Sequence, residues 1–483
     1  MAARARLGLL AALLTLALLP ALAGAAAPGH WTAVTSADGA NIDQVGLART
    51  PDGTLHVAWT RRTPGGGGND DLMQTPIAPS GAVGAAQTLA SNWAGVGSPA
   101  MARAADGSLL IVAGATSSLD PGAISDFGAW RSTDGGASWA QVAGDAALGG
   151  GFSDTPGLAF GSDGATPFFA WGTTYGLWVH RGLSATPATG NFQTGNGFGC
   201  CGYDPGIALD GASGQLVVGW YSNATGHEGV FAQAVDQATG NPAGSPKPMP
   251  GSVTVYGGVS NSSASLARTP VVARPGRAGV FLAYAGGYPT TTKVLLWRFG
   301  AAKSSVLARR AGGVDDVALA ADSAGRLWAV WSGGMRIYAR RSNAKLSSWG
   351  AVVSVPARKG TGSIYKLAAN AQAGALDVLG AFAPNGGSGV QTWATQLQPG
   401  LTLTTAPAKL AAGGRGAQAI TLKVTDAGVP VAGAKVTLAG RSARTGRAGT
   451  AVLAVGPFAH RARLTARATH AGYVSASATV RVR

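Results

Sequence analysis

The chain has 483 residues, and its 37 Lys or Arg against 21 Asp or Glu give a formal net charge of +16. With 46% hydrophobic and 12% charged residues it is not a disordered chain, and its length predicts two or three domains. The six His are scattered and the two Cys are adjacent, so the spacing of a zinc site is absent.

Residues 1–27 predict a secretory signal peptide. Arg4 and Arg6 precede the apolar run Leu7–Leu22, and small residues suited to cleavage follow at Ala21–Ala25. A retained membrane anchor is the alternative, although no later run is long enough to span a bilayer. We therefore expect an exported protein that is extracellular or associated with the cell wall.

A repeated hairpin organises residues 28–400. In its first copy, two apolar runs flank the turn Asp52-Gly53, where glycine accepts the positive φ of a tight turn. Neighbouring copies are 47 to 65 residues apart, a spacing typical of propellers, solenoids and other arrays. The seven copies are Gly46–Trp59, Ala100–Ala113, Gly157–Trp171, Gly206–Trp220, Val271–Tyr284, Val317–Trp331 and Lys366–Gly380.

Three or four strands per copy predict an all-β protein with a β-propeller, because such sheets close radially and leave only short edges. The count favours seven blades, with six as the alternative and an extended β-solenoid as the competing fold. His30–Val34 and Gly389–Thr395 predict strands from both ends that pair in one blade and close the ring. Arg61–Asp71 and Gly240–Pro250 are predicted to be loops.

One turn has a sharper pattern. Ser132, Asp134, Gly136 and Trp139 are spaced so that the Asp can cap its own turn and the Trp can pack beneath it. This resembles the Asp-box of sialidase-type (BNR-repeat) propellers, and a degenerate relative lies at Ser342–Trp349. The resemblance implies a structural role for the motif. No Arg-Ile-Pro motif accompanies it and Glu228 is the single glutamate, so no catalytic residue is carried over.

Residues just before the inner runs are expected at one mouth of the central channel. A ring of carboxylates there could bind a cation, a sugar or a basic group, or could hydrolyse a glycoside if two lie about 5–10 Å apart. Alternatively, these Asp residues cap turns at strand starts. The candidates for ligand binding are Asp43, Asp154, Asp204, Asp315, Asp316, Arg268 and Tyr365.

Cys200 and Cys201 are the only cysteines, and export would place them in an oxidising compartment. A strained vicinal disulfide is predicted, with free thiols and intermolecular linkage as alternatives. The loop leads into the fourth copy, so Phe198 and Tyr203 become candidates for stacking on a sugar.

Residues 401–483 change in composition, with twelve Lys or Arg and a single acid, Asp426. Period-two runs separated by Gly-rich turns predict a small β-sandwich. Val429–Thr437 and His470–Tyr473 resemble bacterial Ig-like or carboxypeptidase-regulatory-like modules, which implies a spacer or adhesion role. The positive charge of residues 401–483 is suited to binding a polyanion. Alternatively, the arginines are simply solvated on the outer faces of the sandwich. The four runs are Ala419–Thr425, Ala434–Leu438, Gly449–Leu453 and Ala462–Ala468.

Together these observations predict a secreted, non-catalytic β-propeller that binds extracellular glycan or another cell-surface ligand. The alternative is a sialidase-like glycoside hydrolase or lyase that uses the channel-mouth Asp residues. We expect a monomer without a cofactor, apart from a cation that the channel could hold. We expect no specific nucleic acid as partner and no membrane span in the mature chain.

Overall fold

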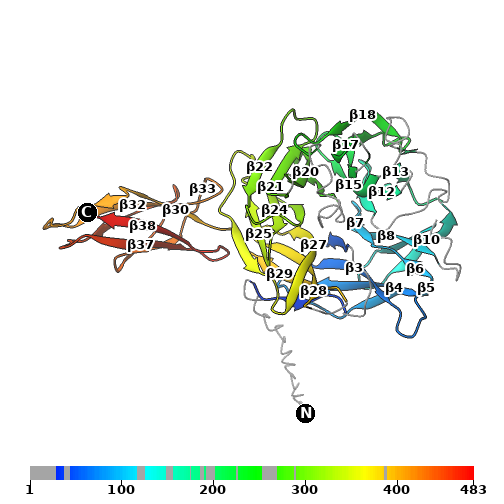
Figure 1. Ribbon diagram of the computed structural model, residues 1–483, viewed down its shortest axis with the longest axis horizontal. Coiled ribbons are helices and arrows are strands. Elements are labelled where there is room, and N and C mark those ends of the chain that lie inside the picture. Colours follow the sequence, from blue (N-terminus) through cyan, green and yellow to red (C-terminus); the bar gives the residue numbers. More distant parts are fainter. Residues whose placement is uncertain are drawn as a thin grey trace, which may run out of the picture.

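The computed structural model describes residues 29–36, 44–116, 126–147, 156–173, 176–184, 190–191, 202–222, 224, 227–252, 269–287, 290–385 and 389–483. These residues form strands and turns, with no helix among them. Seven of the sheets that they form follow one another around a ring, and two more project from one side of it (Figure 1). The prediction of an all-β propeller is confirmed.

Each repeat copy forms the two innermost strands of one sheet, as the repeated hairpin predicted. The first pair has Gly46 opposite Ala58 in antiparallel register. The inner strands are β2 (Gly46–Arg49), β7 (Ala100–Arg103), β11 (Gly157–Phe160), β15 (Gly202–Asp210), β19 (Val271–Arg274), β23 (Val317–Ala321) and β27 (Thr361–Ala371). Their partners are β3 (Leu55–Arg62), β8 (Leu109–Thr116), β12 (Pro167–Thr173), β16 (Gln215–Ser222), β20 (Arg277–Gly286), β24 (Leu327–Ser332) and β28 (Leu376–Pro384).

Two further strands complete each sheet toward its outer edge. The third strands are β4 (Asp70–Ile77), β9 (Asp126–Ser132), β13 (Gly176–Arg181), β17 (Gly229–Val235), β21 (Lys293–Arg298), β25 (Arg336–Arg341) and β29 (Gln391–Leu397). The outer strands are β5 (Gln87–Trp93), β10 (Ala140–Ala147), β14 (Gly190–Asn191), β18 (Pro242–Pro248), β22 (Ser305–Arg309), β26 (Val353–Pro356) and β1 (Thr32–Ala33). A short extra strand, β6 (Gly95–Val96), pairs with β8.

Strands from distant parts of the chain close the ring, as predicted. β1 pairs with β29, and Thr32 lies opposite Ala394. The backbone N–H of Val34 donates to the carbonyl of Thr392 at 2.9 Å, just beyond the strand. The ring of Trp31 packs edge-on against Phe382. This pairing covers the edge that β29 would otherwise expose.

Apolar side chains between neighbouring sheets hold the propeller together. Within the described chain, seven clusters each join one sheet to the next, and one of them packs Val34, Val57 and Trp59 against Leu379 of the last sheet. The packing is therefore continuous around the ring. The largest fully buried side chains are Trp59, Trp130, Trp171, Trp220, Trp297 and Trp328.

The prediction of a loop at Arg61–Asp71 is confirmed for residues 63–69, and the prediction of a loop at Gly240–Pro250 is wrong. Arg61 and Asp71 lie on β3 and β4, where their side chains form an ion pair at 2.9 Å, so only the tip between the strands is a turn. Gly240–Pro250 contains the outer strand β18, which pairs with β17. An edge strand tolerates proline because the missing N–H faces solvent. Composition alone does not distinguish such a strand from a loop.

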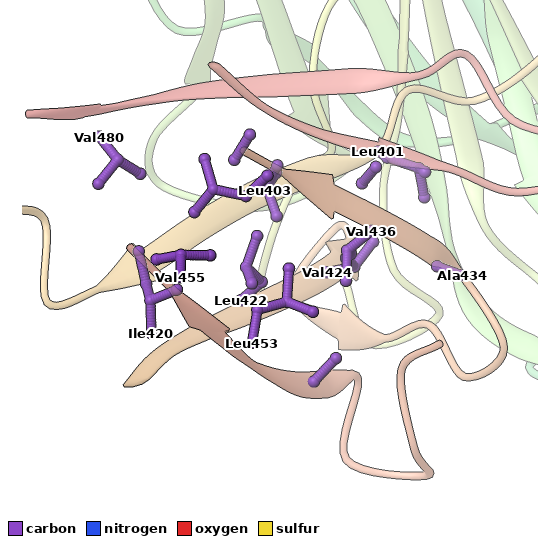
Figure 2. Packing of buried hydrophobic residues seen from close by; sticks show 14 of the residues in the cluster. Leu401, Leu403, Ile420, Leu422, Val424, Ala434, Val436, Leu453, Val455 and Val480 are labelled. Carbon is purple, nitrogen blue, oxygen red and sulfur yellow. The ribbon is translucent and has the colours of Figure 1, made fainter. Parts of the chain in front are cut away.

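The C-terminal residues form two sheets on either side of one apolar core (Figure 2). All four predicted runs are strands. One sheet contains β30 (Thr402–Ala406), β32 (Gln418–Asp426), β33 (Val429–Pro430) and β36 (Thr450–Val455). The other contains β31 (Lys409–Leu410), β38 (Ala476–Val482), β37 (Ala462–Thr469), β34 (Lys435–Leu438) and β35 (Arg441–Arg444).

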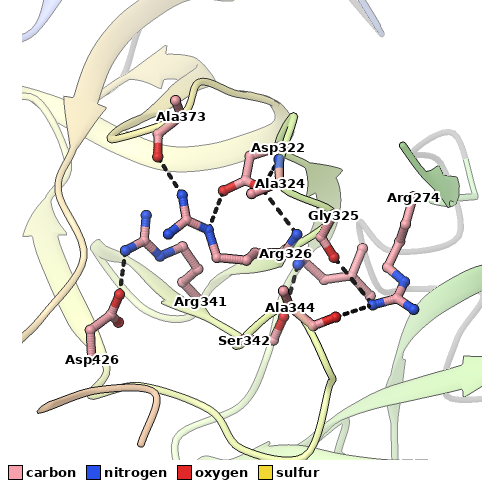
Figure 3. A network of polar contacts seen from close by, with 11 residues as sticks. Arg274, Asp322, Ala324, Gly325, Arg326, Arg341, Ser342, Ala344, Ala373 and Asp426 are labelled. Atoms are coloured by element: carbon pink, nitrogen blue, oxygen red, sulfur yellow. Dashed lines mark hydrogen bonds and ion pairs between the residues drawn. The ribbon is translucent and has the colours of Figure 1, made fainter. Parts of the chain in front are cut away.

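A buried ion pair joins these sheets to the propeller. Arg341, at the end of β25, pairs with Asp426, the last residue of β32, and their side chains are 2% and 9% exposed (Figure 3). Beside it, Asn343 donates to the carbonyl of Ala427 at 3.3 Å. A β-bridge also links Ala351 to Gly400. The C-terminal sheets therefore rest on the turn that follows β25.

Candidate functional site

A narrow channel runs between the inner strands. It encloses about 220 Å³ and is lined by residues from all seven inner strands or the positions just before them. Gln44 and Thr269 are the polar side chains of the lining, which otherwise consists of small or apolar residues. At Gly206 an added Cβ would come within 2.2 Å of the carbonyl oxygen of Thr269, so the strands approach as closely as glycine permits. The channel is smaller than an ordinary ligand pocket, so a larger ligand must lie across one of its ends. We call the end at which the inner strands begin the mouth.

Asp316 links two inner strands at this mouth. It precedes β23, is 1% exposed, and accepts hydrogen bonds from the N–H groups of Val317 at 2.8 Å and Leu367 at 2.6 Å. Burial raises the pKa of Asp316 to about 7, although the charge of Lys366 and these two N–H groups favour the carboxylate. The carboxyl group thus lies within the wall and ties neighbouring sheets together.

Tyr365 and Lys366 stand beside this carboxyl group on β27. Lys366 is buried at 2% exposed, whereas Tyr365 is only half-buried. The Lys366 ammonium lies 5.4 Å from the centroid of the Tyr365 ring. A partly accessible ring next to a buried cation and carboxyl group is therefore present at the mouth.

Asp315 belongs to a second polar group at the same end of β23. Burial raises its pKa, and a backbone hydrogen bond from Gly334 and the charge of Arg310 partly oppose that effect. The Arg310 guanidinium donates to the Tyr338 hydroxyl at 2.8 Å and lies 5.1 Å from the centroid of that ring. This carboxyl group is half-buried beside a cation.

Three tyrosines gather at the mouth end of β15, β16 and β20. Tyr203 lies opposite Tyr221 in register, and the rings of Tyr221 and Tyr284 stack with centroids 6.2 Å apart. Burial, followed by the charge of Glu228 and the neighbouring Tyr203, raises the pKa of Tyr221 to about 12. Tyr221 therefore holds its proton more tightly than an ordinary tyrosine and can donate a hydrogen bond.

Tyr284 extends this group inward. Its side chain is 4% exposed, and its hydroxyl has no hydrogen-bond partner among the described residues. Burial and then Tyr221 raise its pKa well above the ordinary value of 10.0. A buried hydroxyl without a partner is unfavourable.

The backbone at Asp204 is strained. Its φ is +50°, in the left-handed region that residues other than glycine seldom adopt, and a bulge interrupts the pairing of β15 between Tyr203 and Gly206. The Asp204 carbonyl accepts a hydrogen bond from Thr269 N–H at 2.7 Å. Strain of this kind concentrates at functional sites.

The described candidates from the sequence lie at one end of the inner strands. These are Tyr203, Asp204, Asp315, Asp316 and Tyr365. Asp43, Asp154, Phe198, Cys200, Cys201 and Arg268 lie outside the described residues.

The sequence patterns did not indicate that Lys366, Tyr221, Tyr284 and Arg310 belong to the site. Glu228 was considered only as the single glutamate of the chain and not as a site residue. Lys366 starts the seventh copy and could have been found by its equivalence to the other strand starts. The tyrosines of β16 and β20 gave no signal, because their meeting depends on how two sheets pack. Within the described chain, no three His, Cys, Asp or Glu side chains gather as metal ligands.

The Asp134 turn lies at the opposite end of its sheet from the channel mouth. The Asp134 carboxylate accepts from Ser138 N–H at 2.9 Å and Ser132 Oγ at 2.8 Å, and these bonds, with one from the Ser138 hydroxyl, lower its pKa to about 2. The Trp139 ring donates to the carbonyl of Gly136 at 3.2 Å. In the turn that follows β25, Asn343 Oδ1 accepts from Ser347 N–H at 3.1 Å in the same way.

Comparisons with known proteins give structural likeness without a family. No family model and no curated protein matches the chain. Polysaccharide lyase Uly1 has 13% identity and a TM-score of 0.43, covering 75% of this chain and 91% of its own. The Hadza microbial sialidase Hz136 has 13% identity and a TM-score of 0.38, covering 76% of this chain and 68% of its own. A Mycobacterium tuberculosis puromycin-hydrolyzing peptidase has 12% identity and a TM-score of 0.39, covering 83% of this chain and 62% of its own. The range of activities in these names leaves the function to be argued from the site itself.

Across the described residues, the structure contains no helix that is long and apolar enough to cross a membrane.

Proposed function

We propose that the channel mouth binds an extracellular glycan and that the protein acts by binding rather than by catalysis. The observation that carries this proposal is the placement of tyrosine side chains and carboxyl groups at one end of the inner strands. Tyr203 and Tyr365 are half-buried there, and Asp204 and Asp315 lie at the same end of the inner strands. Sugar rings present C–H groups that pack on aromatic faces, while their hydroxyls need polar partners.

The electrostatics support binding. Burial raises the pKa of Tyr221 to about 12, so its phenolate forms less readily than that of an ordinary tyrosine. A nucleophile needs the opposite shift or an adjacent base. Most glycoside hydrolases use two carboxyl groups on either side of the scissile bond, whereas sialidases use a tyrosine nucleophile with a nearby carboxylate. Asp316 is engaged by two backbone N–H groups inside the wall. The charge of Glu228 acts on Tyr221, so the sialidase-like alternative has one described tyrosine and carboxylate to draw on, and the experiment below tests it.

The remaining parts of the proposal follow from the sequence. Residues 1–27 are proposed as a signal peptide, residues 28–400 as the binding propeller, and residues 401–483 as an Ig-like module. The protein would then be secreted and monomeric. The turn of Ser132, Asp134, Gly136 and Trp139 is proposed to be structural, which its position away from the mouth supports.

A glycan array with the mature protein, followed by titration of each hit, tests the proposal. Tyr203→Ala and Tyr365→Ala should each weaken binding about five- to tenfold, since each removes an aromatic contact of about 1–1.5 kcal/mol. Tyr473→Ala is the matched control, because Tyr473 is a partly buried tyrosine of the C-terminal sheets that packs on His470. Binding that survives both mouth substitutions would refute the site. Release of new reducing ends from a bound glycan would refute the non-catalytic reading.

A further inference from the structure

The five-stranded C-terminal sheet carries a row of cations on its outer face. Arg463 of β37 lies opposite Arg481 of β38, and Lys409 of β31 lies opposite Arg481 from the other side. Side chains of directly paired residues share one face of a sheet. Three positive charges therefore stand side by side across three neighbouring strands, spaced by about 4.8 Å.

Alternation along the strands directs these cations to solvent. Lys409, Arg463 and Arg481 are exposed, while the adjacent Leu410 and Val482 are buried at 3% and 2%. Two more cations lie on the same face. Arg467 is four residues after Arg463 on β37, and Lys435 of β34 lies opposite Thr469, which is two residues after Arg467. We call these five residues, Lys409, Lys435, Arg463, Arg467 and Arg481, the basic face.

No acid of the C-terminal sheets balances this charge. Asp426 is the single acid of residues 401–483, and it is paired with Arg341 of the propeller. Like charges directly opposite one another in a sheet are destabilising, so an anion laid across them would relieve the repulsion. A hollow of about 350 Å³ lies at one end of this row of cations. It is lined by Arg461, Arg463, Arg481 and Arg483.

The basic face is separate from the channel mouth. Asp316 precedes β23 at the mouth, and Arg341 ends β25 at the opposite end of the same sheet. The C-terminal sheets rest on that opposite end through Asp426. A ligand on the basic face is therefore held by other residues than a ligand at the mouth.

We propose that the basic face binds a linear polysaccharide that carries carboxylate or sulfate groups. The guanidinium fork matches such groups in two-point geometry, and alternate residues along a strand repeat at about 6.8 Å, which suits charges repeated along a chain. Thr465, Thr479 and Ser477 lie on the same face and supply hydroxyls for sugar hydroxyls.

Nucleic acid fits this surface less well. None of the strands β31, β34, β35, β37 and β38 contains a Phe, Tyr or Trp, so bases have nothing on which to stack. The flat sheet also offers no element that would enter a groove of the double helix. The paired cations and interleaved hydroxyls favour the polysaccharide, and nucleic acid becomes an outcome of the test.

Binding of the full mature chain to dextran sulfate and polygalacturonate tests this proposal. The probes for other occupants are neutral dextran, double-stranded DNA and phosphatidylglycerol vesicles. The variant Lys409→Gln/Arg463→Gln/Arg481→Gln removes the row. The control Arg415→Gln/Lys423→Gln/Arg447→Gln removes three exposed cations elsewhere in the same region, so the net charge is equal. Thermal unfolding checks that both variants are folded.

The row variant should lose about tenfold or more in affinity for the acidic polysaccharides and show a shallower salt dependence, because fewer counterions are released. The control should lose clearly less. Tyr203→Ala should leave this binding unchanged, which separates it from the glycan site at the mouth. Equal losses in both triple variants would overturn the proposal, as would binding to DNA or vesicles without binding to either acidic polysaccharide.

Discussion

Replacing Asp426 with Leu should destabilise the folded protein by about 3–5 kcal/mol, because it leaves a buried charge without its partner. The Arg341 side chain is only 2% exposed, and among the described residues its Nε and Nη1 have no hydrogen-bond partner. The carboxylate of Asp426 is thus the main compensation for burying this guanidinium, apart from the Trp328 ring 5.4 Å away. Arg341→Met should cost a similar amount by leaving the carboxylate unpaired.

The double variant Arg341→Met/Asp426→Leu separates this cause from a general loss of packing. It removes both charges and should lie within about 1–2 kcal/mol of the wild type, so the two substitutions should be strongly non-additive. Urea unfolding followed by tryptophan fluorescence measures all four proteins. Arg62→Met is the control, because its pair with Asp70 is 49% exposed on the arginine side and should contribute at most about 1 kcal/mol. The reasoning would be refuted if the single variants unfolded with free energies within about 1 kcal/mol of the wild type, or if the losses added up in the double variant.

Three further predictions concern the propeller. Gly136→Ala should destabilise the folded protein by about 2–4 kcal/mol more than backbone strain alone, because the added Cβ would lie 2.2 Å from the His56 ring. Gly135 has a similar positive φ but open space around it, so equal thermal shifts for Gly135→Ala and Gly136→Ala would contradict this prediction. The pKa of Asp316 is about 7 in the folded protein and 3.8 in its ordinary state, so the folded protein holds the proton more tightly. The free energy of unfolding should therefore fall as pH rises between these two values. Asp316→Asn should remove this pH dependence in denaturant titrations at pH 5 and 8. Val34→Ala should cost about 1–2 kcal/mol in thermal unfolding by weakening the closure of the ring, and an unchanged melting temperature would show that the closure contributes little.

Much of the fold could be predicted from local patterns. The turn at Asp52-Gly53 and the apolar runs around it recur, and each copy forms an inner strand pair. The strand-turn-strand pattern is local, because strand alternation and the φ of a turn glycine depend on neighbours in sequence. Outer strands were harder: β18 looks like a loop by composition, since an edge strand needs fewer apolar side chains and tolerates proline.

The candidate site was only partly within reach of the sequence. The equivalence of strand starts predicted that Asp204, Asp315, Asp316 and Tyr365 share one mouth, and this placement is found. The sequence did not indicate that Asp316 would be buried inside the wall, because the amide of Leu367 that engages it belongs to another sheet.

The sequence by itself determined the all-β pattern, the repeat and the concentration of positive charge after residue 400, because these depend on composition and on neighbours along the chain. Only the tertiary structure decided which side chains meet. Tyr221 stacks on Tyr284 across two sheets, Arg341 meets Asp426 across 85 positions, and Arg463 stands opposite Arg481 through strand register. Such contacts are set by packing and register between distant segments, and a shift of one residue in register would turn each side chain to the other face.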